Sequence, residues 1–129
     1  MDNGEKKPTF ASCLTTYRTR LGLSMRKFAE KIGASAMYIS HLEYGTYAAP
    51  ENEMLEKIIK GLNLSPQEER EVYDIAASER SETAIAQDTR NYIMENPIIV
   101  QALRTAKDGG FGLAEWQRFI EECEKKNNQ

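Results

Sequence analysis

Apolar residues recur every three or four positions along most of the chain, which is the spacing of a helix with one buried face. No segment alternates apolar and polar residues as a half-buried strand does. The pattern therefore predicts an all-α fold. The eight expected helices cover residues 10–21, 25–32, 36–44, 50–62, 66–77, 84–95, 97–107 and 113–125.

Capping residues define most of these boundaries. Thr9, Ser24 and Ser35 each precede an amphipathic segment and are favoured N-caps. Glycines end the first three helices, where the chain needs a left-handed residue. The strongest start signal is Ser65-Pro66-Gln67-Glu68, which combines a capping box with proline at the first helical position.

Three short helices joined by a tight glycine turn near the N-terminus are the arrangement of a helix-turn-helix. We accordingly predict a flexible arm over residues 1–9, a helix-turn-helix domain over residues 10–78 and a helical extension over residues 79–129. The extension begins after a polar segment typical of a linker.

Charge is distributed unevenly along the 129 residues. The whole chain has a formal net charge of −3, but residues 1–47 carry +3 and the remainder carries −6. A basic front and an acidic back suit a protein that meets a polyanion at one end only. A chance fluctuation in a short chain is the alternative.

The remaining composition favours a cytoplasmic protein. No apolar run approaches the ~18 residues of a membrane span, and residues 1–9 contain no apolar core of a secretory signal. Cys13 and Cys123 lie near opposite ends of the chain, and we expect free thiols in a reducing compartment. The single histidine, without a recognisable nucleophile pair or metal-ligand spacing, predicts no enzyme, no metal and no cofactor.

The segment from Ser24 to Gly45, SMRKFAEKIGASAMYISHLEYG, resembles the helix-turn-helix of the Cro- and lambda-repressor-like family, also called the XRE family. Ala29 stands where the two helices cross, Gly33 stands at the turn, and the ending S-H-L-E-Y-G matches the family's S-x-[apolar]-E-x-G. The buried positions are taken by Phe28, Ile32, Ile39 and Leu42. The resemblance implies a five-helix DNA-binding domain, here followed by about three C-terminal helices.

Two charged residues match a further family feature. The resemblance implies an ion pair between Arg18, late in the first helix, and Glu43, near the end of the third. Such a pair would hold these two helices together. The alternative is that both side chains simply face solvent.

The resemblance also implies which residues read DNA, because the third helix of this family enters the major groove. Ala36, Met37, Ser40 and His41 occupy the base-contacting positions. Bidentate Arg, Asn and Gln contacts are missing, so specificity is expected to lean on apolar contacts, DNA shape or dimer spacing. For Met37 the alternative is packing, and for His41 it is a solvent-facing residue without a role.

Phosphate contacts are expected from the start of the second helix and from polar groups around the third. The candidates are Ser24, Met25, Arg26, Lys27, Tyr38, Tyr44, Thr46 and Tyr47, with Arg20 as a further one. Helix N-termini suit phosphate because their first N–H groups are free. The loop over residues 46–50 is uncharged, which departs from the family's often basic loop.

These features together predict a transcriptional regulator that binds double-stranded DNA and represses its own or a neighbouring operon. The acidic C-terminal helices present apolar faces suited to a homodimer, to packing on the N-terminal core, or to another protein. An antitoxin or a protease-controlled regulator of a mobile element is therefore the alternative, with a toxin or protease as partner. We expect no membrane association and no small-molecule substrate.

Overall fold

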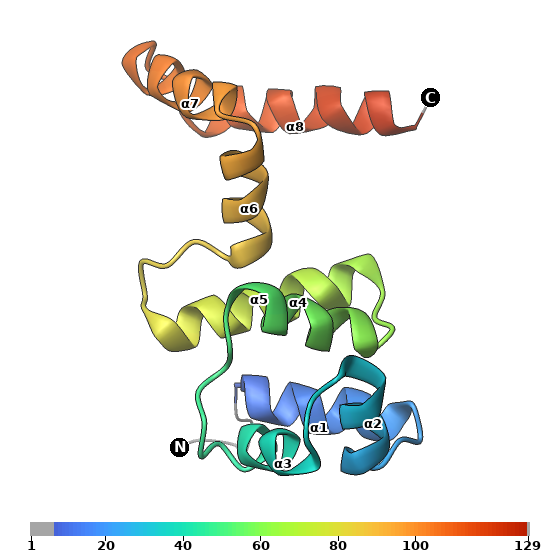
Figure 1. Cartoon of the computed structure of the whole chain (residues 1–129). Coiled ribbons are helices and arrows are strands. Elements are labelled where there is room, and N and C mark those ends of the chain that lie inside the picture. Colours follow the sequence, from blue (N-terminus) through green and yellow to red (C-terminus); the bar gives the residue numbers. More distant parts are fainter. Residues whose placement is uncertain (1–6, 129) are drawn as a thin grey trace, which may run out of the picture. The chain divides into compact units, whose positions relative to one another are not determined.

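The structure is a computed structural model that describes residues 7–128, and this part of the chain consists of helices and loops without a strand (Figure 1). The all-α prediction is confirmed. The helices are α1 Phe10–Arg20, α2 Met25–Ile32, α3 Ala36–Glu43, α4 Asn52–Gly61, α5 Pro66–Arg80, α6 Gln87–Glu95, α7 Ile98–Asp108 and α8 Leu113–Asn127. Within the described range, no helix is both long and apolar enough to cross a bilayer.

The predicted caps act where the first helices begin. The hydroxyl of Ser24 accepts a hydrogen bond from the Lys27 amide at 3.1 Å, and that of Ser35 accepts one from the Tyr38 amide at 3.1 Å. Gly33 follows α2 with φ +74°, a left-handed conformation that costs glycine little. The predicted bounds of α2 therefore agree with the structure at both ends.

Four predicted boundaries are wrong by two or more residues, and the other ends agree to within one residue. One of the four is the end of α8, which continues to Asn127 rather than Lys125. Helix α4 begins at Asn52 rather than Pro50, because Glu51 has an extended backbone and takes the N-cap position. Helix α5 continues to Arg80, because distant partners hold its last turn: Glu79 accepts a hydrogen bond from the Phe10 amide at 2.9 Å, and Arg80 pairs with Glu51 at 3.2 Å. Helix α6 begins at Gln87 rather than at residue 84, because the preceding residues form a turn in which the Ala84 amide bonds the Ser81 carbonyl.

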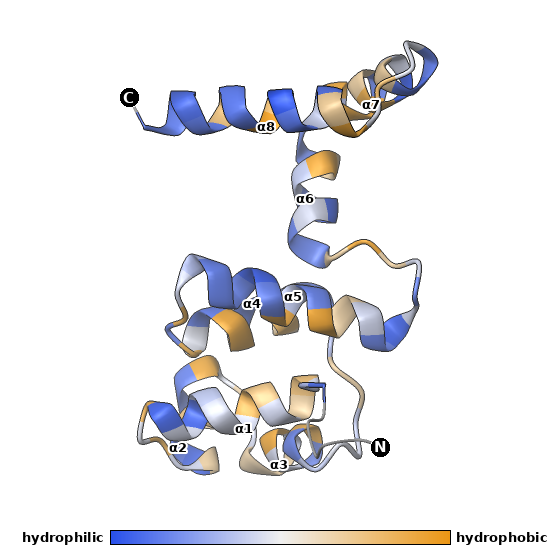
Figure 2. Ribbon diagram, turned by 180° about the vertical axis from the view of Figure 1, so that it is seen from behind, coloured by the Kyte–Doolittle hydropathy of each residue, from blue (hydrophilic) through white to orange (hydrophobic). Residues whose placement is uncertain are grey.

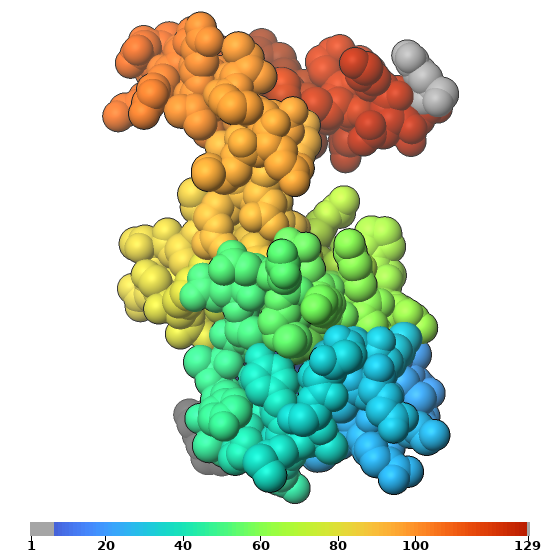
Figure 3. Space-filling model, viewed as in Figure 1, coloured from blue at the N-terminus to red at the C-terminus, as the bar shows by residue number. Residues whose placement is uncertain are grey.

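The chain divides into two compact units, Met1–Arg90 and Asn91–Gln129. In the first unit, α1, α2 and α3 lie against α4 and α5, with apolar surfaces turned toward one another (Figure 2). The innermost side chains are Phe28, Ile39, Ile58 and Ile59, none of which is accessible to solvent. This core fixes α2 and α3 as a rigid pair at one end of the unit (Figure 3).

Two further contacts bind α4 to its surroundings. At Gly61 the helix approaches α2 so closely that an added Cβ would lie 2.6 Å from Cγ2 of Ile32. At the other end, the buried amide of Gln87 accepts a hydrogen bond from the Asn52 amide at 2.6 Å and donates one to the Asn52 carbonyl at 2.9 Å. These two hydrogen bonds to the backbone hold Asn52 in its left-handed conformation, with φ 59°.

Candidate nucleic-acid interface

Helices α2 and α3 form a tight pair around a short turn. The Ala34 amide donates to the Ala29 carbonyl at 2.8 Å, which closes the end of α2 and directs the chain into α3. Ala29 is 1% exposed, and its small side chain allows the close approach of its neighbours. The sequence thus sets the angle between the two helices through one small residue and one left-handed glycine.

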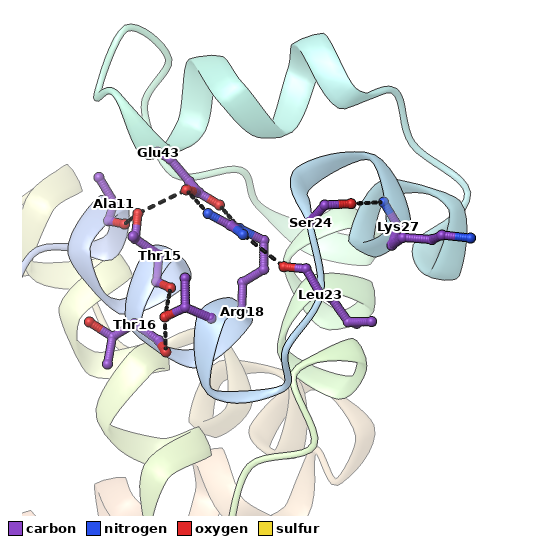
Figure 4. Close-up of polar contacts among 9 residues, drawn as sticks. Ala11, Thr15, Thr16, Arg18, Leu23, Ser24, Lys27 and Glu43 are labelled. Atoms are coloured by element: carbon purple, nitrogen blue, oxygen red, sulfur yellow. Dashed lines mark hydrogen bonds and ion pairs between the residues drawn. The ribbon is translucent and has the colours of Figure 1, made fainter.

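A nearly buried ion pair connects α1 to α3 (Figure 4). The Nε atom of Arg18 lies 2.5 Å from Oε2 of Glu43, and its NH2 group donates to Oε1 at 2.8 Å. The Thr15 hydroxyl also donates to Oε1, at 3.0 Å. The hydrogen bonds to Glu43 raise the pKa of the Arg18 guanidinium, so the arginine keeps its positive charge.

The same arginine also fixes the approach to α2. The NH1 group of Arg18 donates to the Leu23 carbonyl at 2.8 Å, directly before the Ser24 cap (Figure 4). One side chain therefore holds the end of α3 and the start of α2 in a single arrangement. Any ligand that contacts both helices meets a preformed surface.

The outer face of α3 is at least partly exposed, and apart from the His41 imidazole its side chains are apolar or carry a hydroxyl group. Met37 is 71% exposed and Tyr44 76% exposed, while Ala36 and Ser40 are partly exposed. Met37, Ser40 and Tyr44 follow one another at helical spacing and so share a face. These side chains offer apolar contacts and one hydroxyl to whatever lies against α3.

His41 belongs to a small aromatic cluster that the sequence analysis did not anticipate. Its ring stacks on Tyr47 with centroids 4.4 Å apart, and Tyr38 lies 6.1 Å from the same tyrosine. The Tyr47 amide donates to the His41 carbonyl at 3.1 Å, which returns the loop onto α3. The imidazole is therefore held in place, because a ring on the following loop covers one of its faces.

The first turn of α2 combines free amides with cations. Intrahelical bonding starts with the Phe28 amide, so those of Met25 and Arg26 point out of the helix end. The side chains of Arg26 and Lys27 are exposed and form no ion pair within the described residues. This helix end can accept an anion.

Other predicted phosphate contacts have different surroundings. The guanidinium of Arg20 is bonded to both carboxylate oxygens of Glu68, at 2.7 and 3.0 Å. Met25 and Tyr38 are partly buried against the core, and burial raises the pKa of the Tyr38 phenol. Thr46 is exposed on the loop after α3. The structure thus brings most of the predicted site residues together on α2, α3 and this loop, and it directs Arg20 away from them.

Comparison with protein families gives one match, a family described as helix-turn-helix, over residues 14–68. That range begins within α1 and ends in the first turn of α5, and so it contains the whole surface described above. Neither the comparison with curated proteins nor that with solved structures gives a match.

Proposed function

We propose that the protein is a DNA-binding regulator of the Cro- and lambda-repressor-like type that represses its own or a neighbouring operon, because residues 14–68 match a helix-turn-helix family. Helix α3 lies in the major groove and α2 lies across the phosphate backbone in this proposal. The observation that carries it is the exposed, preformed face of α3, held to α1 by the Arg18–Glu43 pair.

The chemistry of α3 limits how bases are read. Ala36 and Met37 offer only apolar contact, which suits a thymine methyl group, and Ser40 can bond either a donor or an acceptor. His41 is the one ring nitrogen donor on this face, and Tyr47 fixes its plane. We therefore assign the sharpest base discrimination to His41, with Tyr47 as the residue that positions it.

The phosphate contacts are concentrated at the start of α2. The amides of Met25 and Arg26, with the charges of Arg26 and Lys27, fit one or two phosphates on one strand. Ser24, Tyr44, Thr46 and the Tyr47 hydroxyl are neutral, and they can add hydrogen bonds without adding charge. Because only Arg26 and Lys27 contribute charge there, the affinity for DNA should depend only modestly on salt concentration.

Specific binding also needs more base contacts than one such helix provides. Two copies that read half-sites one helical turn apart, about 34 Å, double the contacts. A bound dimer at a promoter then excludes other proteins from it, which is the simplest route to repression.

The test is a titration of the protein with the DNA upstream of the gene. Binding is measured by fluorescence anisotropy at a series of salt concentrations. Arg26→Ala should weaken binding to every sequence and reduce the salt slope by about one unit. His41→Ala should lose roughly 1–3 kcal/mol of discrimination at one base pair. Tyr47→Ala should lose part of the same discrimination, at the same base pair.

Lys57→Ala is the matched control, since Lys57 is an exposed lysine on α4, outside α2, α3 and the loop that follows α3. It should leave the affinity and the salt slope unchanged. If no DNA binds at low salt, or if His41→Ala weakens all sequences equally, the proposed reading by α3 is refuted. Reporter expression that falls when the protein is deleted would indicate activation rather than repression.

A further inference from the structure

The second unit contains an open groove of about 800 Å³ bounded by α7, α8 and the loop between them. Its lining is uncharged and mostly apolar, and all of it lies within residues 91–129. Trp116 lines it, and its ring is in edge-to-face contact with Phe111 and Phe119, with centroids 5.2 Å and 5.8 Å away. Further large side chains in the lining are Tyr92, Ile98 and Leu103.

This unit does not bury its own apolar residues. Ala106, at 8% exposed, is the one buried apolar residue among its described residues, and α8 has no buried residue. Units of about 40 residues rarely close a sufficient core without help. The groove and the exposed side of α8 therefore need a cover that this chain does not supply within the second unit.

The exposed apolar area matches what a dimer needs. Leu113, Trp116 and Ile120 follow one another at helical spacing on α8, and Leu113 and Ile120 are 75% and 54% exposed. In the groove, the side chains of Tyr92, Ile98, Leu103, Phe111 and Phe119 are 44–68% exposed, so groove and stripe together form an apolar surface of several large side chains. A standard interface buries about 800 Å² on each partner.

The charges beside this surface are complementary to each other. Lys107 stands one turn after Leu103 on α7, and Glu124 stands one turn after Ile120 on α8, so each borders the apolar surface. Neither forms an ion pair within the described residues. On the other side of α8, by contrast, Glu115 pairs with Arg118 and Glu122 pairs with Lys125.

We propose that a second copy of this chain covers the groove, with α8 of each protomer lying along the α7–α8 groove of the other. A two-fold arrangement makes each contact twice, because the same patch serves on both protomers. Lys107 of one protomer then meets Glu124 of its partner, and the apolar stripe of α8 fills the groove. The use of this dimer for paired half-sites rests on the proposed function, whereas the dimer itself does not.

The first experiment measures the mass of the full chain by light scattering over a range of concentrations. The wild-type chain should be a dimer. Ile120→Ser should raise the dimer dissociation constant at least tenfold, because it removes apolar contact at two equivalent places. Ile85→Ser is the matched control, since Ile85 is also 54% exposed but lies before α6, and it should leave the constant unchanged.

Charge reversal tests the orientation. Lys107→Glu and Glu124→Lys should each weaken the dimer severalfold, and the double variant should recover the wild-type constant. A monomer at all concentrations would overturn the proposal and leave the groove to a different protein, such as a toxin or protease. A dimer in which the double variant is weaker than either single variant would overturn the assigned contact.

The two proposals fail separately. A dimer that binds no DNA would leave this interface in place and refute the proposed function. DNA binding by a monomer would support the proposed function and refute the dimer interface.

Discussion

Replacing Glu43 by alanine should cost far more stability than its position at the end of α3 suggests. The change removes the two hydrogen bonds that the carboxylate accepts from Arg18, at 2.5 and 2.8 Å. Arg18 keeps only its bond to the Leu23 carbonyl, at 2.8 Å. Arg18 is 9% exposed, so its unpaired charge would have little access to water.

The magnitude follows from that burial. Breaking a buried ion pair by removing one partner costs roughly 3–5 kcal/mol, and the slight exposure of this pair favours about 3 kcal/mol. For a domain of this size, each kcal/mol lowers the melting temperature by about 4–8 °C. The expected decrease in the melting temperature of the first unit is therefore about 12–24 °C.

The assay is urea and thermal unfolding of the full chain followed by far-ultraviolet circular dichroism. Trp116 lies in the second unit, so its fluorescence does not report on this domain. Arg20→Met is the matched control, because it removes the partner of Glu68 at a surface where water can solvate the remaining charge. If Glu43→Ala is no more destabilising than this control, the pair does not stabilise the fold.

A double replacement separates stability from specificity. Arg18→Met with Glu43→Leu leaves no unpaired charge, and it should recover much of the lost stability. If the double variant folds well but binds DNA without sequence preference, the pair serves mainly to place α3.

Two further predictions concern packing and pH. Gly61→Ala should destabilise the first unit by about 1 kcal/mol in urea unfolding. Alanine has the better helix propensity, but its methyl group would crowd the stiff Ile32 side chain, and this crowding costs more. A variant more stable than the wild type would refute the close contact. Hydrogen bonds from Arg20 and Ser65 lower the pKa of Glu68 to about 2 from an ordinary 4.5, so its stabilising contribution is complete above about pH 4.5 and is lost as the pH falls toward 2. Glu68→Gln should therefore flatten the stability profile in that window and nowhere else, as unfolding at a series of pH values would show.

Local signals allowed the first three helices to be predicted well, and distant contacts explain where prediction failed. Helix α2 has a serine cap at one end and a left-handed glycine at the other, so its limits are encoded by neighbouring residues. The start of α4 is different, since Gln87, 35 positions away, holds the backbone of Asn52. No local pattern of residues around Pro50 contains that information.

The same distinction applies to the candidate site. Residues on α2 and α3 follow helical periodicity, so their exposed positions could be predicted. The stacking of Tyr47 on His41 depends on the path of the loop after α3, and the uncharged residues of that loop gave no sign of it. The one available signal was the presence of three tyrosines and the only histidine within residues 38–47.

The arrangement of charge explains how a chain with a net charge of −3 can approach a polyanion. Arg18 and Arg20 are neutralised by carboxylates, and the Lys31 ammonium group donates to the Gly61 carbonyl at 2.7 Å. The cations left without such partners on the helix-turn-helix are Arg26 and Lys27, in the first turn of α2. Within α2 and α3, positive charge is therefore concentrated where the free amides point. In the proposed complex, this surface orients DNA with few contacts and leaves the choice of sequence to the outer face of α3.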